Sequence, residues 1–328
     1  MNKRVIIIGG GIVGCLSALE FKKKGFDVTI IEKSDIGYES SSAAAGILYP
    51  LMPWKYDDAL YELSLGAAEF YAELSKKLLK DFNKDIEYIK SGLLLLPPYN
   101  EDEFIKWSKK NKTSFLKRNN SILLPEVAQV NPKKLMSSIK ELVVSMSIKI
   151  FENLAVTGIK TNTNSIDAVY TDDNKEYKGD IFVLSAGAWS SIIYEKLAKK
   201  IKPIRGQIIE YFAKDLIIEN ILYSQGIYIL QRKNRSIIAG STLEDVGFSD
   251  KNLQTKFLEL DRKAKDVLED LQKCSIDRTW HGFRPGVDDN YPIVSKDENY
   301  GNMFIHSGHF RYGITTAPAT TKILMSYF

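Results

Sequence analysis

The chain has 328 residues, which is enough for one large domain or for two of ordinary size. Its composition, 44% hydrophobic and 26% charged, is typical of a globular protein, and a net charge of +4 on scattered lysines provides no basic face for nucleic acid. Two cysteines give no disulfide framework, no apolar run reaches transmembrane length, and a motif close to Met1 leaves no signal peptide to expect. We therefore expect a cytoplasmic protein with no nucleic-acid partner and no stable membrane insertion.

Residues 5–32 are the most informative part of the sequence. Four β-branched residues at 5–8, Val-Ile-Ile-Ile, predict a parallel strand that is buried on both faces. The run 12–24 has apolar residues at helical spacing, and 28–31 supplies a second strand. The order of strand, helix and strand predicts a βαβ unit.

The turn between the first strand and the helix has the spacing Gly9-x-Gly11-x-x-Gly14, and Glu32 ends the second strand. Gly9 permits a tight turn, Gly11 lets the backbone approach a pyrophosphate, and Gly14 lets the helix lie close to the sheet with its N-terminus facing the phosphates. An acid about twenty residues further on binds ribose hydroxyls, which fits FAD or NAD and disfavours NADP. These features together predict a site for an adenine dinucleotide rather than an ordinary glycine turn.

Small residues fill the stretch 40–47, Ser-Ser-Ser-Ala-Ala-Ala-Gly-Ile. Small side chains let backbone and hydroxyl groups approach a ligand closely, although a flexible loop would have a similar composition. Apolar residues at helical spacing from Leu60 to Leu78 then predict one long amphipathic helix, which Asp57 or Asp58 can cap.

The middle of the chain alternates strands and helices. A strand is expected at 92–96, a helix from Asn131-Pro132 with proline at its first position, and a region of strand pairs at 148–159. Residues 181–184 form a second buried strand that ends in small residues before a helix, as the first strand does. We therefore expect the chain to return to the first sheet after a long excursion.

The last third adds a strand-rich region and a tail rich in glycine and aromatic residues. We expect a strand at 207–212, a hairpin of 227–230 with 236–239, a charged helix at 252–273 and a short final helix ending at Phe328. The elements together predict an open α/β dinucleotide sheet, assembled from both ends and the middle of the chain, with a second domain inserted.

Two arginines, Arg284 and Arg311, occur in what read as glycine-containing turns with aromatic neighbours. An arginine fork binds a carboxylate through two parallel hydrogen bonds, and Tyr228 on the predicted hairpin offers a hydroxyl to the same group. Structural salt bridges are the alternative interpretation. The three histidines have no Cys, Asp or Glu at ligand spacing, so no metal site is predicted.

These motifs resemble the glycine oxidases of the thiamine-synthesis type, within the D-amino-acid oxidase superfamily of FAD enzymes. Two places depart from the pattern of many relatives, since Gln231 precedes Arg232 where they have proline, and 292–295 reads Pro-Ile-Val-Ser. The matching pieces span the whole chain in the family's order: 9–14 with Glu32, 42–47, 49–54, 185–189, 204–207, 239–244, 283–286, 308–314 and 317–320.

The resemblance implies an α/β fold in which a glutathione-reductase-like FAD-binding domain carries an inserted α+β substrate domain built on a mixed, largely antiparallel sheet. Residues 1–80, 132–200 and 296–328 would form the FAD-binding domain, and residues 81–131 and 201–295 the substrate domain.

The resemblance also implies a site. Arg284 would hold the substrate carboxylate with Tyr228 and Arg311 near it, and FAD would be non-covalent because no cysteine lies in the flavin-facing C-terminal segments. No catalytic acid or base beyond flavin positioning is expected, since the flavin does the difficult step. The residues expected to bind FAD are Gly9, Gly11, Ile12, Val13, Gly14, Glu32, Lys33, Ser40, Ser41, Ala45, Gly46, Ile47, Val156, Ala186, Gly187, Trp189, His309, Phe310, Arg311, Tyr312, Gly313, Ile314 and Thr315.

The implied function is FAD-dependent oxidative deamination of glycine or a small amino acid. Hydride transfer to the flavin gives an imino acid, which hydrolyses to a 2-oxo acid and ammonia, while O2 is reduced to hydrogen peroxide. The imine would serve thiazole formation in thiamine biosynthesis, and a homo-oligomer is left open. The alternatives are a D-amino-acid dehydrogenase that reduces a quinone or carrier, and a flavin-binding protein without turnover, which would not need Arg284 and Tyr228.

Overall fold

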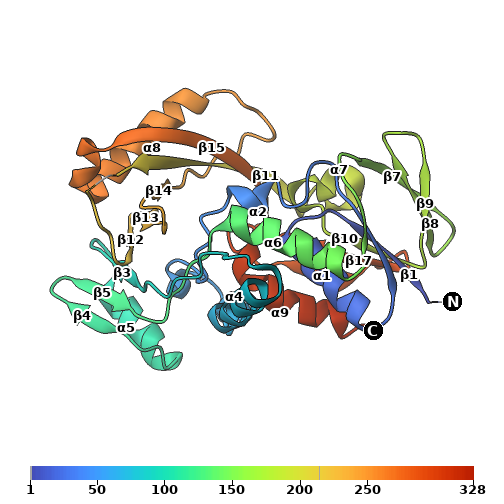
Figure 1. Ribbon diagram of the computed structural model, residues 1–328, viewed down its shortest axis with the longest axis horizontal. Coiled ribbons are helices and arrows are strands. Elements are labelled where there is room, and N and C mark those ends of the chain that lie inside the picture. Colours follow the sequence, from blue (N-terminus) through green and yellow to red (C-terminus); the bar gives the residue numbers. More distant parts are fainter. Residues whose placement is uncertain (1, 214) are drawn as a thin grey trace.

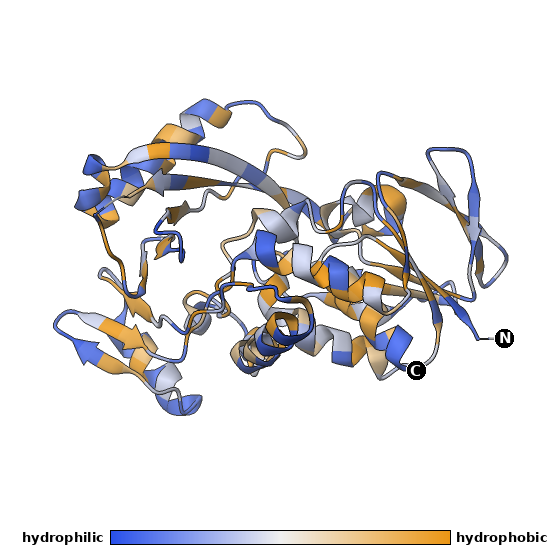
Figure 2. Ribbon diagram, viewed as in Figure 1, coloured by the Kyte–Doolittle hydropathy of each residue, from blue (hydrophilic) through white to orange (hydrophobic). Residues whose placement is uncertain are grey.

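The computed structural model describes residues 2–213 and 215–328. Two large sheets occupy opposite ends of an elongated molecule, and both termini lie at the end that holds the first strand (Figure 1). Hydrophobic residues concentrate on the strands that lie between helices, and hydrophilic residues on the outer loops (Figure 2). Within the described residues, no helix combines the length and the apolar character that crossing a membrane requires.

The first large sheet has six strands in the order β16-β17-β10-β1-β2-β6. Five of them are parallel, and β16 runs antiparallel to β17 at one edge. The chain enters this sheet at its start, middle and end, as the sequence predicts. The strands are β1 (Arg4–Ile8), β2 (Asp27–Ile31), β6 (Lys149–Phe151), β10 (Ile181–Leu184), β16 (Ile293–Lys296) and β17 (Met303–Ser307).

Both faces of this sheet are covered, which explains why its strands do not alternate between apolar and polar residues. Helices pack on one face, and a three-stranded antiparallel sheet packs on the other. The predicted strand region 148–159 is divided between the two sheets. The covering elements are α1 (Ile12–Lys23), α4 (Ala67–Phe82), α6 (Pro132–Ser145) and α9 (Gly313–Met325) on the first face, and β7 (Val156–Thr161), β8 (Ile166–Thr171) and β9 (Glu176–Lys178) on the second.

The second large sheet has eight strands in the order β15-β11-β14-β13-β12-β3-β5-β4, all paired antiparallel except β12 with β3. The predicted hairpin is confirmed as β13 and β14. Helices α8 (Leu253–Val267) and α5 (Glu101–Lys110) pack on its two faces. The strands are β3 (Leu93–Leu95), β4 (Leu116–Arg118), β5 (Ser121–Leu124), β11 (Lys202–Phe212), β12 (Ile221–Ser224), β13 (Ile227–Gln231), β14 (Ile237–Gly240) and β15 (Ser275–Gly286).

Two predicted helices are shorter than the apolar pattern indicates. The long helix predicted from the apolar residues between Leu60 and Leu78 is broken into α3 (Asp58–Ser64) and α4 because Gly66 takes a left-handed conformation with φ +74°. Helix α8 ends at Val267, since Leu268 is extended, and a 3-10 turn follows. The remaining short helices are α2 (Ser40–Ala43), α7 (Ser190–Ile193) and the 3-10 turns Pro53–Lys55, Gly187–Trp189, Glu195–Leu197 and Glu269–Lys273.

The predicted division of the chain between an FAD-binding and a substrate domain stays a proposal. The strands of the eight-stranded sheet all fall in the segments 81–131 and 201–295. Strand β16 joins the six-stranded sheet from Ile293, slightly before the proposed boundary at 296.

Candidate functional site

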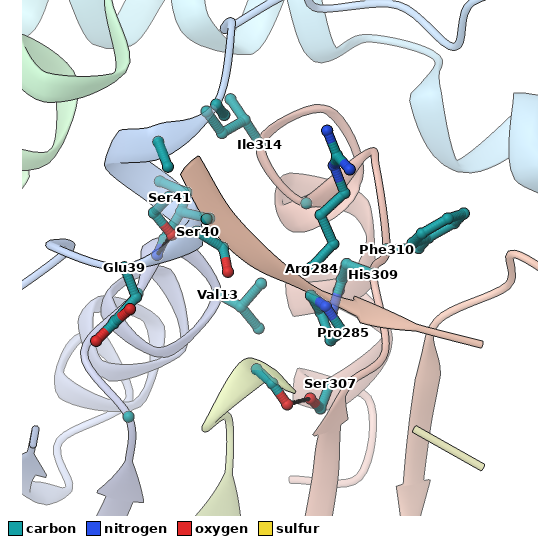
Figure 3. A pocket seen from close by; sticks show the side chains of 18 of the residues that line it. Val13, Glu39, Ser40, Ser41, Arg284, Pro285, Ser307, His309, Phe310 and Ile314 are labelled. Carbon is teal, nitrogen blue, oxygen red and sulfur yellow. Dashed lines mark hydrogen bonds between the residues drawn. The ribbon is translucent and has the colours of Figure 1, made fainter. Parts of the chain in front are cut away.

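A cavity of about 460 Å³ lies between the two large sheets. Its lining comes from the carboxyl ends of β1, β2, β10 and β17 on one side and from β11, β13 and β15 on the other. Figure 3 shows the Arg284 side chain extending from its strand toward the loop near Ile314, with Ser40 on the other side of the strand. Ligands bind at this edge of open α/β sheets, so the cavity is the candidate site.

The glycine turn is built for close approach of backbone to backbone. Gly9 has φ +105°, and a Cβ atom there would lie 2.5 Å from the carbonyl oxygen of Ser185. A Cβ on Gly14 would lie 1.9 Å from the carbonyl oxygen of Gly9, so this glycine holds α1 against β1 as predicted. Gly11 forms the N-cap of α1 and faces the cavity. A cradle that leaves no room for side chains fits a pyrophosphate at the N-terminus of a helix.

Glu32 lies at the end of β2 and is 7% exposed. Its carboxylate accepts hydrogen bonds from the backbone N–H groups of Gly10 (2.6 Å) and Ser34 (2.9 Å). Burial raises the pKa of Glu32, while the two hydrogen bonds and Lys33 oppose this increase. Glu32 therefore closes the glycine turn and also presents a carboxylate edge to the cavity, where ribose hydroxyls can donate to it.

Replacing Glu32 by alanine should weaken FAD binding by about tenfold or more, because each charge-assisted hydrogen bond contributes roughly 1.5–3 kcal/mol. Glu32→Gln, which keeps one acceptor oxygen, should lose less. Fluorescence titration of the apoprotein with FAD measures both. An unchanged dissociation constant in Glu32→Ala would show that the carboxylate only closes the turn.

The small-residue stretch contacts both halves of the molecule. The Ser41 hydroxyl accepts a hydrogen bond from the N–H of Ile12 (3.0 Å), and the Ser40 hydroxyl donates to the carbonyl of Phe283 on β15. Gly46 has φ +75°, and a Cβ there would lie 2.1 Å from the carbonyl oxygen of Val130. The flexible-loop interpretation is therefore wrong, since the stretch is held on several sides.

Arg232, which the sequence analysis did not assign to the site, anchors the same stretch from the substrate side. Its guanidinium is buried and donates to the carbonyls of Ala45 (2.7 Å) and Val130 (2.9 Å) and to the side chain of Gln129 (3.1 Å). Residues 45–47 line the cavity, so Arg232 positions its wall. An arginine at the end of a strongly apolar hairpin strand was the available signal.

Arg284 lies within β15 and not in a turn, which corrects the sequence prediction. Its Nη2 donates to the Ser241 hydroxyl (2.8 Å) and its Nη1 to the carbonyl of Thr242 (3.1 Å). The guanidinium lies over the backbone of Gly206, where a Cβ would approach its atoms to 2.0–2.2 Å. Among the described residues, the Nε–H of Arg284 has no acceptor and Nη2 donates only to Ser241, so N–H groups of the guanidinium remain for a ligand.

Arg311 reaches the same cavity from the loop between β17 and α9. Among residues 2–213 and 215–328, no carboxylate lies within salt-bridge distance of Arg284 or Arg311. The structural salt-bridge interpretation is therefore wrong. Burial and the nearby charge of Arg311 lower the pKa of Arg284 to about 10, which still leaves it charged at neutral pH. Two half-buried guanidinium groups without an acid favour an anionic ligand.

Tyr228 and Tyr312 complete the polar end of the cavity. Tyr228 is 5% exposed, and a Cβ on Gly240 would lie 2.4 Å from its hydroxyl, so glycine leaves room for the phenol. Burial raises the pKa of Tyr228, which keeps the phenol protonated as a hydrogen-bond donor. The Tyr312 hydroxyl donates to the hydroxyl of Tyr56 (2.8 Å).

The histidines serve the packing around the cavity. His309 forms a hydrogen bond through Nε2 with Thr320 (3.0 Å), and burial lowers its pKa to about 3. His306 forms one through Nδ1 with Ser17 (2.9 Å), whereas His281 faces Asp250 (3.2 Å). Burial and the neighbouring His309 lower the pKa of His306 as well, so both cavity histidines are neutral. Across the residues that the structure describes, no cluster of three His, Cys, Asp or Glu could hold a metal ion.

The cavity brings together almost every residue that the sequence analysis assigned to the site. Gly14 is the exception, because it packs α1 on the sheet and does not face the cavity. These positions show proximity, and the individual roles stay proposals. The lining residues that sequence reasoning missed include Glu39, Tyr49, Leu51, Gly206, Ser241 and His306.

A family model described as FAD dependent oxidoreductase matches residues 4–326. The glycine oxidase of Pseudomonas putida is 28% identical over 98% of this chain and 93% of its own length. The bifunctional protein ThiO/ThiG of Trichormus variabilis is 28% identical over the whole of this chain, which corresponds to 53% of that protein.

Among solved structures, the glycine oxidase of Geobacillus kaustophilus has a TM-score of 0.89 at 21% identity, with 99% of this chain and 94% of that chain covered. An L-proline dehydrogenase from P. horikoshii has a TM-score of 0.85 at 21% identity, with 98% and 92% covered. These likenesses confirm the predicted fold class.

Proposed function

Because this chain belongs to the family of FAD dependent oxidoreductases, we propose that it oxidises glycine or another small amino acid with O2 as electron acceptor. The products are a 2-oxo acid, ammonia and hydrogen peroxide. The observation that carries this proposal is the guanidinium of Arg284, which has no acid partner among the described residues, keeps N–H groups without an acceptor and lines the same cavity as the glycine turn. The similarity to glycine oxidases along nearly the whole chain supports it.

The residues present fit an FAD molecule. Gly9, Gly11 and the N-terminus of α1 would hold the pyrophosphate, Glu32 the ribose, and the backbone of residues 45–47 the flavin end. When bound, FAD supplies the two-electron oxidation of the substrate. The other requirements fall on the protein, which must bind the substrate, orient it and exclude water.

We propose that the FAD is bound without a covalent link. Cys15 lies within α1, where its thiol donates to the carbonyl of Gly10 (3.3 Å), and Cys274 follows the 3-10 turn after α8. Neither is among the cavity-lining residues of the described chain. Acid precipitation should therefore release intact FAD into the supernatant, as measured by its absorbance and chromatographic mobility. Flavin that stays with the precipitate would contradict the proposal.

The polar end of the cavity would bind the substrate carboxylate. The free edge of Arg284 can form two parallel hydrogen bonds, and Tyr228 and Arg311 add donors. Fixing the carboxylate limits the directions in which the Cα–H bond of the substrate can point, and positioning of this kind supplies up to roughly 7–11 kcal/mol of a barrier. No side chain needs to act as an acid or base if the amine enters neutral.

Anaerobic mixing with glycine, sarcosine and small D-amino acids tests the function, with flavin reduction followed by absorbance. Reduction by at least one of them, followed by rapid reoxidation in O2 with formation of peroxide, is the expected result. Slow reoxidation by O2 but fast reoxidation by a quinone would instead indicate a D-amino-acid dehydrogenase. No reduction by any member of the panel would favour a flavin-binding protein without turnover.

We also propose a role in thiamine biosynthesis, in which the imine feeds thiazole formation. The similarity to a bifunctional ThiO/ThiG protein supports this role. Loss of the protein should make growth depend on an added thiazole. Normal growth without thiazole would contradict this role and leave the oxidase activity untouched.

A further inference from the structure

Arg284 lies on β15, and its guanidinium lies over Gly206 of β11. Two of its hydrogen-bond acceptors, however, come from a segment outside both strands. This segment, residues 241–244, follows β14, and it supplies the Ser241 hydroxyl and the Thr242 carbonyl as acceptors for the guanidinium. Because no acid holds Arg284 within the described residues, these two acceptors and the backbone beneath set its position. The groups that hold residues 241–244 in place therefore set the direction of the Arg284 guanidinium.

Glu244 ties this segment to β11. Its Oε2 accepts from Arg205 Nη2 (2.6 Å) and Nε (3.3 Å), and its Oε1 accepts from Gln207 (3.1 Å) and from the Thr242 hydroxyl (2.5 Å). The backbones pair as well, since Glu244 N–H donates to the Arg205 carbonyl (3.0 Å) and Arg205 N–H to the Glu244 carbonyl (2.9 Å). The carboxylate thus has partners on both oxygens.

Arg205 extends the same connection to the rest of the loop. It is 0% exposed and donates to the carbonyls of Ser249 and Lys251 (2.8 Å) in addition to Glu244. Burial alone would raise the pKa of Glu244, but hydrogen bonds from Arg205, Thr242 and Gln207 lower it. The pair is therefore ionic at neutral pH. A buried ion pair is weak evidence for stability, and the contacts of this one fix the segment beside Arg284.

Neither Arg205 nor Glu244 is among the described residues that line the cavity, although Gly206 and Ser241 beside them are. We propose that Glu244, paired with Arg205, is a positioning residue that sets the direction of the Arg284 guanidinium and so the affinity of the site for a carboxylate. The inference rests on the proposed substrate-binding role of Arg284.

A second buried glutamate, on the same strand as Arg205, offers a control. Glu210 on β11 is 4% exposed and is paired with Arg278 on β15, but it has no contact with residues 241–244 or Arg284 among the described hydrogen bonds. Glu210→Gln and Glu244→Gln both replace a buried carboxylate by a neutral group of the same shape. Because the Arg205 side chain is wholly buried and the Arg278 side chain is 54% exposed, Glu244→Gln should lower the Tm more than Glu210→Gln, so acetate affinity rather than Tm distinguishes a positioning role from a structural one.

The experiment uses the FAD-loaded protein and acetate, a monocarboxylate that cannot be oxidised as an amino acid. Perturbation of the flavin spectrum reports acetate binding independently of turnover, and Arg284→Ala, which should abolish binding, is the reference. Glu244→Gln should raise the dissociation constant of acetate, and the KM of the amino acid, by roughly ten- to a hundredfold, because small displacements of a positioning group have such effects. Its kcat should change less. Glu210→Gln should bind acetate like the unchanged protein even if its Tm falls.

Equal acetate affinity in Glu244→Gln and the unchanged protein would overturn the inference. If Glu244→Gln fails to fold, Glu244→Asp is the alternative variant, because it keeps the charge but shortens the side chain. It should show an intermediate loss of acetate affinity. Unchanged acetate affinity in Glu244→Asp would also overturn the inference. Failure of the proposed function looks different, since every amino acid would then leave the flavin oxidised while the acetate titration still separates the two glutamine variants.

Discussion

Replacing Arg284 by alanine should leave the protein folded and loaded with FAD but nearly inactive. The guanidinium has no acid partner among the described residues, so its removal breaks no ion pair. Truncating one partner of a desolvated charge pair with the substrate costs roughly 2–5 kcal/mol, so kcat/KM should fall by about two to four orders of magnitude. Flavin content, Tm and steady-state kinetics on one preparation measure the effect.

Arg284→Lys is the companion variant. An ammonium keeps the charge but cannot form two parallel hydrogen bonds, so activity should be restored only in part. A normal kcat/KM per bound flavin in Arg284→Ala would show that another group binds the carboxylate, with Arg311 the first to test because it reaches the same cavity.

Gly206→Ala should also inactivate the protein without unfolding it. A Cβ at this position would lie 2.0–2.2 Å from the Arg284 guanidinium, which is the end of a flexible side chain and can move away. The backbone of Gly206 is not in the left-handed region, so alanine meets no conformational penalty there. A displacement of about 1 Å at a positioning group costs roughly 10²-fold, and we expect a loss of that size in kcat/KM.

Gly158→Ala is the control for this variant, because Gly158 also lies in a strand, β7, where a Cβ would find its nearest contact at 3.9 Å. It should retain full activity. Tm and circular dichroism should be similar for both variants. Activity in Gly206→Ala close to that of the control would show that the guanidinium can bind substrate from a second position.

The parts of the fold that follow from local pattern were predictable. The signals for the βαβ unit 4–31, which are a β-branched run, glycines at fixed spacing and an apolar helix, all lie within about 30 residues of sequence. This unit was therefore predicted correctly. The hairpin of β13 and β14 was also predicted correctly, because its two strands are close together in the sequence. The break at Gly66 was missed because apolar residues continue at helical spacing on both sides of it.

Arg284 was placed in a turn because the stretch around it contains Gly282, Pro285 and Gly286, which usually interrupt strands. The structure makes it part of a twelve-residue strand because β11 pairs with β15 from end to end, with Gly206 opposite Gly282. Pairing between segments some 80 residues apart cannot be predicted from the residues of either segment alone.

The sequence by itself thus identified the FAD-dependent family, the βαβ unit with its glycine turn and the residue types that can bind a carboxylate, since those properties depend on short-range spacing and side-chain chemistry. Only the tertiary structure showed which groups hold the Arg284 guanidinium, that Gly206 makes room for it and that Glu244 fixes the segment beside it. Those features arise where β11, β14 and β15 meet, and distances between segments remote in sequence are set by packing.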